Sequence, residues 1–259
     1  MKKTVLITGA SSGIGRELAR GAASQGNNLV VVARNIEKLD ELKKELENKY
    51  DISVTIIGKD LSKPNAGKEI FEETKSKNIK IEYLINNAGF GGHGYFYERE
   101  WEKDRDMINV NIMALTELTR FFLPEMVKNN SGKILNIAST AAFFPGPLQA
   151  VYYATKSYVL SFSQGIAEEV RDNNITVTVF CPGATETEFA KRGNLEKTSL
   201  FKTKLASPDK VAKLAYKAMV KGKLFATSEP YHSFMGRFVI PFFSRRSVLK
   251  ISKSYMETK

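Results

Sequence analysis

The chain has little sulfur or imidazole: one cysteine and two histidines among 259 residues. The lone Cys181 excludes an intrachain disulfide, which suits a reducing compartment, and we expect a cytoplasmic protein. Cys181 ends an apolar run, so we interpret it as a buried small residue and not as a nucleophile. No cluster of metal ligands surrounds His93 or His232 in the sequence, and no metal site is predicted.

Long hydrophobic runs and linkers are also missing. No stretch reaches the roughly 20 apolar residues of a transmembrane helix. The apolar run after Met1 ends at residue 8, which is too short for a signal peptide. Because no Pro/Gly/Ser-rich linker, repeat or low-complexity tract divides the chain, we expect one domain over residues 1–259.

Acidic residues are too few to balance the basic ones, and the net charge is +11. The lysines are scattered, however, and in residues 37–49 (E-K-L-D-E-L-K-K-E-L-E-N-K) they alternate with acids, as on a solvated helix face. No nucleic-acid-binding motif is present. A phosphorylated cofactor therefore explains local basic residues better than a nucleic acid does.

Short apolar runs alternate with helical stretches along the chain. The runs cover residues 4–8, 28–33, 53–58, 81–86, 133–138 and 175–181. This alternation predicts an α/β fold with a single doubly wound, Rossmann-like parallel sheet and helices on both faces.

Tyr152 and Lys156 are four residues apart, which places them on one face of a helix. An ammonium near the phenol would lower the tyrosine pKa from about 10 and ease proton exchange at neutral pH. The pair alone is a weak signal. Residues 8–15 (T-G-A-S-S-G-I-G) strengthen it, because a strand, a glycine turn and a helix in that order form a phosphate cradle.

The glycine spacing G-x-x-x-G-x-G, followed by N-N-A-G at residues 86–89, Ser139, Tyr152 with Lys156, and Pro182-Gly183, resembles the short-chain dehydrogenase/reductase family. The resemblance covers about the first three quarters of the chain. It implies an oxidoreductase that interconverts a ketone and a secondary alcohol, with the hydride supplied by the cofactor.

The resemblance also implies a role for each matching residue. Tyr152 would be the proton donor or base, Ser139 a second hydrogen-bond donor, Lys156 the residue that lowers the Tyr152 pKa and holds the cofactor ribose, and Asn111 the residue that holds a relay water. Asn109 is the alternative to Asn111. The implied cofactor-binding residues are Gly9, Ser11, Ser12, Gly13, Ile14, Gly15, Arg34, Asp60, Asn87, Ala88, Gly89, Tyr152, Lys156, Pro182, Gly183, Thr185 and Thr187.

The end of the second strand predicts the type of cofactor. An acidic residue at this place grips the ribose of NAD, whereas an arginine accommodates the phosphate of NADP. Residues 33–35 read A-R-N, so we predict NADP(H), with Arg34, Arg16 and Lys38 around the phosphate. A pairing of Arg34 with Glu37 or Glu41 is the alternative. Asp60 either contacts the adenine or caps a helix.

The substrate is predicted only by class. We expect Ser139, Tyr152, Phe90 and Phe144 to contact a small-molecule ketone or alcohol, and apolar neighbours favour an apolar one. A 3-ketoacyl thioester reductase, a 3-hydroxy acid dehydrogenase and a non-catalytic NADP-sensing protein remain alternatives. His93 is expected in a solvated loop.

Two segments lie outside the motifs. Residues 187–206 occupy the place of a mobile substrate lid, and their basic residues are Lys191, Arg192, Lys197, Lys202 and Lys204. Residues 233–259 form a C-terminal extension on the substrate side. It is open to three interpretations: a helix over the pocket, a contact in a homodimer or homotetramer, or a basic membrane anchor. We expect the first two combined.

Overall fold

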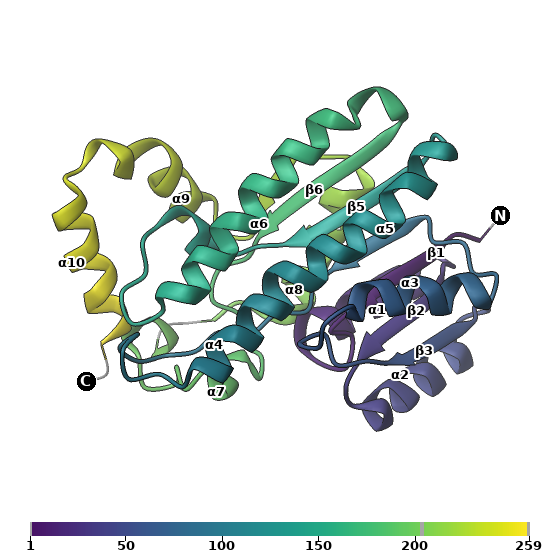
Figure 1. The fold of residues 1–259 in the computed structure, drawn as a ribbon, viewed down its shortest axis with the longest axis horizontal. Helices are drawn as coiled ribbons and strands as arrows, with labels where there is room; N and C mark the ends of the chain where they lie inside the picture. Colours follow the sequence, from purple (N-terminus) through teal and green to yellow (C-terminus); the bar gives the residue numbers. More distant parts are fainter. Residues whose placement is uncertain (1, 203–204, 258–259) are drawn as a thin grey trace.

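The computed structural model describes residues 2–202 and 205–257 (Figure 1). Lys204 of the predicted lid lies outside these residues. The strands are β1 (Thr4–Thr8), β2 (Asn28–Ala33), β3 (Val54–Gly58), β4 (Tyr83–Asn86), β5 (Gly132–Ile137), β6 (Ile175–Cys181) and β7 (Phe225–Thr227). Six of them match the predicted runs within two residues, and β7 was not predicted.

All described strands belong to one parallel sheet in the order β3-β2-β1-β4-β5-β6-β7. The chain builds outward from β1 to β3 and then returns to add β4 on the other side of β1. The strand order therefore reverses between β1 and β4, and ligands of such sheets bind at the carboxyl ends of the strands beside this point.

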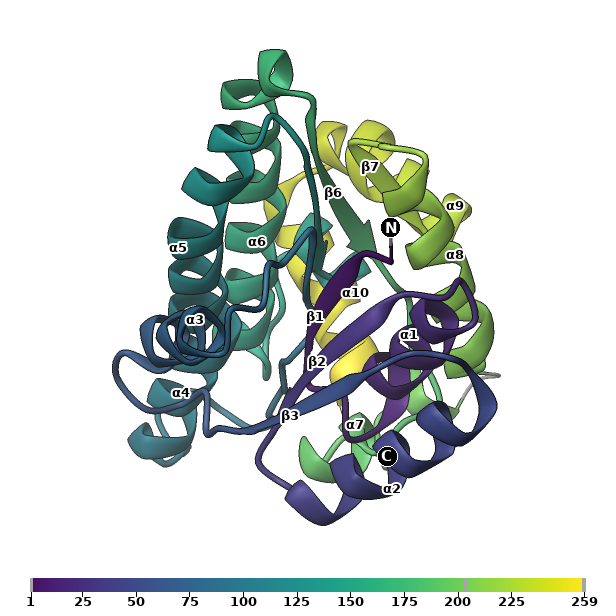
Figure 2. The same ribbon diagram turned by 90° about the vertical axis from the view of Figure 1, so that its right-hand side faces the viewer.

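Helices cover both faces of the sheet (Figure 2). The helices are α1 (Gly13–Ala23), α2 (Ile36–Lys49), α3 (Ala66–Ser76), α4 (Trp101–Ile108), α5 (Leu115–Lys128), α6 (Ala150–Glu169), α7 (Phe189–Arg192), α8 (Pro208–Val220), α9 (Pro230–Phe234) and α10 (Arg245–Met256). On one face lie α1, α2 and α8, and on the other lie α3, α5 and α6.

The strands are buried on both faces, which explains their continuous apolar runs. Successive side chains of a strand point to opposite faces. Val5 and Ile7 accordingly belong to the core under α1, α2 and α8, and Leu6 belongs to the core under α3 and α5.

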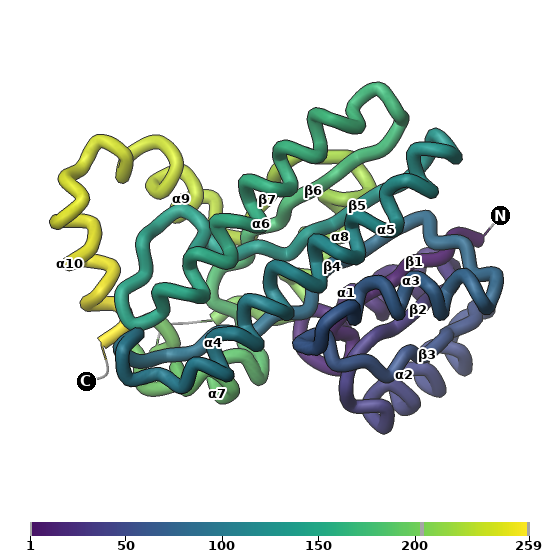
Figure 3. The backbone as a smooth tube through the Cα atoms, viewed as in Figure 1, coloured from purple at the N-terminus to yellow at the C-terminus, as the bar shows by residue number. Residues whose placement is uncertain are grey.

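Residues 230–257, which we call the C-terminal arm, extend beyond the sheet (Figure 1). The arm comprises α9, a π-helical turn (Met235–Val239), a 3-10 turn (Ile240–Phe242) and α10. Figure 3 follows its backbone away from the sheet and back along α10. The return is fixed by contacts, because α10 packs against the turn Ser199–Lys202 and the carbonyl of Met256 accepts a hydrogen bond from His93 Nε2 at 2.7 Å.

Candidate active site

The glycine turn after β1 has a backbone that favours glycine. Gly9 and Gly13 have φ values of +68° and +54°, in the left-handed region. A Cβ on Gly15 would lie 2.2 Å from the carbonyl oxygen of Gly9. At the start of α1, the Ser12 side chain makes no capping hydrogen bond. The helix N-terminus and the bare turn fit the pyrophosphate of a dinucleotide.

Thr8 and Asn87 join the ends of β1 and β4 beneath this turn. The Thr8 hydroxyl oxygen accepts the N–H groups of Asn87 and Ala88, both at 3.0 Å. In return, Asn87 Nδ2 donates to the Thr8 carbonyl at 2.9 Å. The predicted residues of the turn and of N-N-A-G are thus adjacent. Thr8 was not singled out from the sequence, although its place at the strand end was a signal.

Ser139, Tyr152 and Lys156 come together at the carboxyl end of β5. Ser139 follows this strand, and its Oγ accepts the N–H of Ala141 at 3.1 Å. Tyr152 and Lys156 share one face of α6, with Lys156 Nζ 5.9 Å from the centre of the Tyr152 ring. Both side chains are buried, and Lys156 Nζ donates to the carbonyl of Ile137 at 2.9 Å.

Burial governs the ionisation of this pair. It raises the pKa of Tyr152 well above its usual value, and hydrogen bonding to the Ser139 side chain lowers it only in part. Burial also lowers the pKa of Lys156 from 10.5 to about 8. The sequence had predicted a tyrosine pKa lowered by Lys156. The opposite shift has a physical cause, because desolvation disfavours the charged form of each group.

Asn111 lies in a π-helical turn, Asn109–Ala114, between α4 and α5. Its side chain donates to the carbonyl of Phe90 and to Thr155 Oγ1, both at 3.0 Å, and accepts the N–H of Phe90 at 3.1 Å. A Cβ on Gly89 would lie 3.1 Å from Asn111 Oδ1 and 3.3 Å from Lys156 Nζ. Asn109 instead donates to the carbonyl of Ser62. Of the two asparagines, Asn111 is the one beside Lys156.

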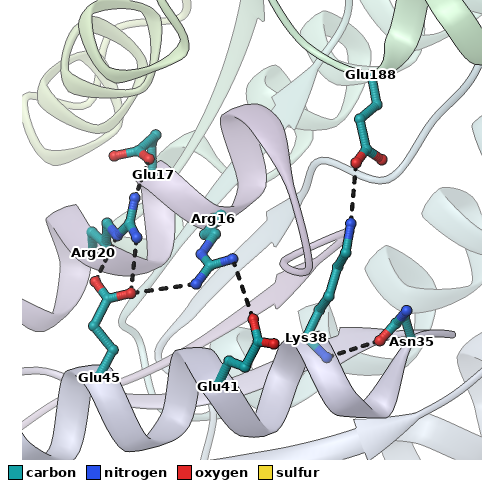
Figure 4. A network of polar contacts seen from close by, with 8 residues as sticks. All are labelled: Arg16, Glu17, Arg20, Asn35, Lys38, Glu41, Glu45 and Glu188. Carbon is teal, nitrogen blue, oxygen red and sulfur yellow. Dashed lines mark hydrogen bonds and ion pairs between the residues drawn. The ribbon is translucent and has the colours of Figure 1, made fainter.

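The predicted phosphate-binding residues differ in their ion pairing (Figure 4). Arg16 lies 3.9 Å from Glu41 and 3.4 Å from Glu45 of α2, and Lys38 lies 3.0 Å from Glu188. Arg34 is exposed at the end of β2. Among residues 2–202 and 205–257 it has no ion pair, so the alternative pairing with Glu37 or Glu41 is absent there.

Asp60 holds a local turn. Its Oδ1 accepts the N–H of Ser62 at 3.0 Å and the Ser62 hydroxyl at 2.9 Å. Burial raises the pKa of Asp60, but these hydrogen bonds and the nearby Arg34 and Lys63 outweigh burial, and the pKa is lowered. The next helix begins only at Ala66, so Asp60 does not cap it.

The segment after β6 crosses the glycine turn. Thr187 lies against Gly13, where an added Cβ would be 3.0 Å from the threonine methyl group. Thr185 Oγ1 donates to the carbonyl of Gly183, which follows Pro182, at 2.9 Å. Thr185 also pairs with Ala206 through a parallel bridge. Both ends of the 187–206 segment are therefore held close together.

Aromatic side chains line the space beside Tyr152. Phe90 packs in the same cluster, and Phe189 of α7 has its ring centre 5.3 Å from that of Tyr152. A cavity of about 50 Å³ adjoins Tyr152. Phe144 lies further off, near Gly236 of the arm. Sequence reasoning missed Phe189, although it is an aromatic residue of the predicted lid.

The structure also shows the environments of His93 and Cys181, for which the sequence made predictions. His93 is half-buried and hydrogen-bonded to Met256, so its expected place in a solvated loop is wrong. The reason is that the arm folds back over this loop. Cys181 is fully buried at the end of β6, and burial raises the pKa of its thiol to about 12, which leaves no thiolate for a nucleophile.

The reversing parallel sheet, the glycine turn at a helix N-terminus and the Ser-Tyr-Lys arrangement define a dinucleotide-binding oxidoreductase. The chain belongs to the short-chain dehydrogenase/reductase family, since the family profile described as short chain dehydrogenase matches residues 3–198. Members of this family act on carbonyl and alcohol groups, as the resemblance predicted. The predicted family and fold class are confirmed.

Curated relatives and solved structures agree with this assignment. A very-long-chain 3-oxoacyl-CoA reductase of Danio rerio is 34% identical over 73% of this chain, which spans 61% of that relative's length. An NADP-dependent 3-hydroxy acid dehydrogenase of Schizosaccharomyces pombe is 35% identical over 73% of each chain. The structure of a short-chain dehydrogenase from Sphingobium yanoikuyae in complex with NADPH is similar with a TM-score of 0.83, 33% identity and 90% of each chain covered.

Proposed function

We propose that this protein uses NADP(H) to interconvert a ketone and a secondary alcohol. The observation that carries the proposal is the convergence of Ser139, Tyr152 and Lys156 beside the glycine turn, at the reversal point of the sheet. The cofactor supplies and accepts the hydride when bound, and the residues of this chain supply placement and proton transfer.

In the reductive direction, the hydroxyls of Ser139 and Tyr152 donate hydrogen bonds to the carbonyl oxygen as negative charge develops on it. The raised pKa of Tyr152 keeps the phenol protonated at neutral pH. Tyr152 can therefore give its proton to the forming alkoxide. In the reverse reaction Tyr152 accepts the proton of the alcohol.

Lys156 and Asn111 lie near Tyr152 and are proposed to resupply its proton. With a pKa of about 8, the Lys156 amine is mostly protonated at pH 7 and can replenish the proton of Tyr152. Asn111 is fixed by Phe90 and Thr155 and lies near Lys156. This position supports a relay from solvent to the active site, as the family resemblance implies.

Two observations support NADP(H) over NAD(H). Arg34 is an exposed cation at the end of β2, and residues 33–35 contain no carboxylate. A planar guanidinium suits a phosphate group. The Sphingobium yanoikuyae structure is a complex with NADPH, and the Schizosaccharomyces pombe relative is NADP-dependent.

A 3-oxoacyl thioester or 3-hydroxy acid is the second, finer candidate for the substrate. The names of the Danio rerio and Schizosaccharomyces pombe relatives support it. Phe90 and Phe189 supply the apolar surroundings that an acyl chain requires. The ring centre of Phe189 lies 5.3 Å from that of Tyr152, so Phe189 covers the proposed proton donor, and the proposal includes a movement of Phe189 and the 187–206 segment when the substrate enters.

The experiment is NADPH oxidation with 3-oxoacyl thioesters of short and long chain, free 3-oxo acids and simple ketones. A higher kcat/KM for the thioesters than for simple ketones supports the thioester as substrate. Turnover of simple ketones alone would contradict the thioester proposal and support only the general ketone–alcohol activity. Tyr152→Phe is the control, because it keeps the ring and removes the proton. NADPH binding without turnover of any substrate would favour the sensor alternative.

A further inference from the structure

The C-terminal arm exposes a helical stripe of aromatic residues. Tyr231, Phe234 and Phe238 follow the i, i+3, i+7 spacing of one helix face, yet they are 69%, 57% and 56% exposed. Phe242 and Phe243 continue the surface at 88% and 56% exposure. A stripe with this spacing normally faces a core. A contiguous exposed aromatic surface indicates a binding partner.

The same arm is basic. Between Pro230 and Met256 there is no aspartate or glutamate, whereas five residues carry full positive charge: Arg237, Arg245, Arg246, Lys250 and Lys253. Four of them lie on α10, and Arg245 and Arg246 are both exposed. The partner of this surface must therefore accept aromatic side chains and carry negative charge.

A second segment enlarges the surface. Tyr95, Phe96 and Tyr97 are 44%, 63% and 78% exposed, and the rings of Tyr95 and Tyr97 stack with centres 5.5 Å apart. Lys253 Nζ of α10 lies 5.9 Å from the centre of the Tyr95 ring. The loop at residues 95–97 and the arm thus lie side by side, and the loop adds three exposed aromatic rings to the basic arm.

We propose that the arm and the 95–97 loop dock on the surface of a bilayer that contains anionic lipids. Aromatic rings suit the headgroup boundary, and lysine and arginine are attracted to anionic headgroups. A second copy of the chain suits this surface poorly. A twofold contact brings the same residues together, and Arg237, Arg245 and Arg246 would then face their own copies. Glu257 is the one acidic residue of the arm, and it already pairs with Lys253 at 3.6 Å.

The proposed docking is peripheral. Within residues 2–202 and 205–257, no helix combines the length and the hydrophobicity that crossing a bilayer requires. Gly236 of the arm lies against Phe143 and Phe144, which follow Ser139, and α10 packs against the turn Ser199–Lys202. The arm is therefore joined to the substrate side of the molecule, and docking brings that side to the lipid surface.

The test is flotation of the full chain with vesicles of equal parts phosphatidylcholine and phosphatidylglycerol, and with phosphatidylcholine alone. We expect flotation with the anionic vesicles and little with the neutral ones. At about 1 M salt, where the Debye length is about 3 Å, binding should weaken strongly.

Two double variants probe the two properties of the surface. Arg245→Glu with Arg246→Glu should reduce the vesicle partition constant at least about 25-fold, since each of the two basic residues removed contributes about fivefold. These residues begin α10, where acidic side chains favour a helix, so the helix should persist. Phe242→Ser with Phe243→Ser should reduce partitioning at least about tenfold.

Matched controls carry the same changes elsewhere. Lys44→Glu with Lys128→Glu reverses two exposed charges on α2 and α5, and Leu214→Ser removes an exposed apolar residue of α8. These control variants should bind the anionic vesicles nearly as strongly as the wild type does. The proposal is overturned if the wild type stays unbound, or if the arm variants and controls bind alike. A concentration-dependent dimer lost only in the arm variants, without vesicle binding, would assign the surface to a second copy.

Discussion

Replacing the buried Lys156 by methionine should stabilise the protein while removing its activity. The structure lowers the pKa of Lys156 from 10.5 to about 8 through burial. A tenfold change in proton affinity is worth about 1.4 kcal/mol. At pH 7 the shift therefore costs the folded state about 3 kcal/mol, which methionine avoids because it carries no charge.

One interaction is lost in exchange. Lys156 Nζ donates to the Ile137 carbonyl at 2.9 Å, and the unpaired carbonyl costs about 1–2 kcal/mol. We expect a net gain of about 1–2 kcal/mol at pH 7. For a chain of this size the gain corresponds to a rise in Tm of roughly 3–6 °C.

The pH dependence provides the sharper test. A group whose folded pKa is lowered contributes stability above its unfolded pKa and loses it as pH falls to the folded value. Wild-type stability should thus rise, relative to Lys156→Met, between pH 8 and pH 10.5. At pH 10 the ionisation cost falls to about 1 kcal/mol, so the advantage of the variant should vanish.

The assay is thermal unfolding of both proteins without cofactor at pH 7 and pH 10. Comparison at the same pH cancels the titration of all other groups. Lys44→Met, at an exposed position of α2, is the control and should show no such convergence. A variant that is less stable than the wild type at pH 7, or a difference that is constant with pH, would refute the reasoning.

Three further predictions follow from the site. Tyr152→Phe should keep NADPH binding and lose at least about 100-fold in kcat, because a general acid contributes that much, and stopped-flow binding with steady-state kinetics separates the two effects. Arg34→Asp should raise the KM for NADPH at least about tenfold and leave the KM for NADH unchanged or lower, and equal effects on both cofactors would remove Arg34 from the site. Glu188→Gln should lower the KM for NADPH by up to about fivefold by releasing Lys38, with less effect on NADH, since an exposed ion pair is worth at most about 1 kcal/mol.

The fold and the glycine turn were predictable because both depend on patterns of residues that are close together in the sequence. Runs such as residues 29–33 are apolar throughout, as in a strand that is covered on both faces. Gly9 and Gly13 have the left-handed φ values that favour glycine. β7 was missed since it has three half-buried residues and gains its place only by pairing with β6.

The electrostatics of the site were less predictable. The four-residue spacing of Tyr152 and Lys156 correctly gave one helix face, but it gave no information about burial, which reverses the expected pKa shift of the tyrosine. Similarly, the sequence placed Arg16 and Lys38 near a phosphate, whereas Glu45 and Glu188, distant in the chain, already pair with them. Such partners are set by tertiary structure.

The position of the 187–206 segment depends on both of the surfaces described above. On the cofactor side, Glu188 pairs with Lys38 at 3.0 Å. On the other side, α10 of the arm packs against the turn Ser199–Lys202. Phe189, between these two points, lies on Tyr152. If the segment opens for the substrate as proposed, a backbone movement that carries Phe189 away from Tyr152 would disturb the Lys38–Glu188 ion pair, the packing of α10, or both.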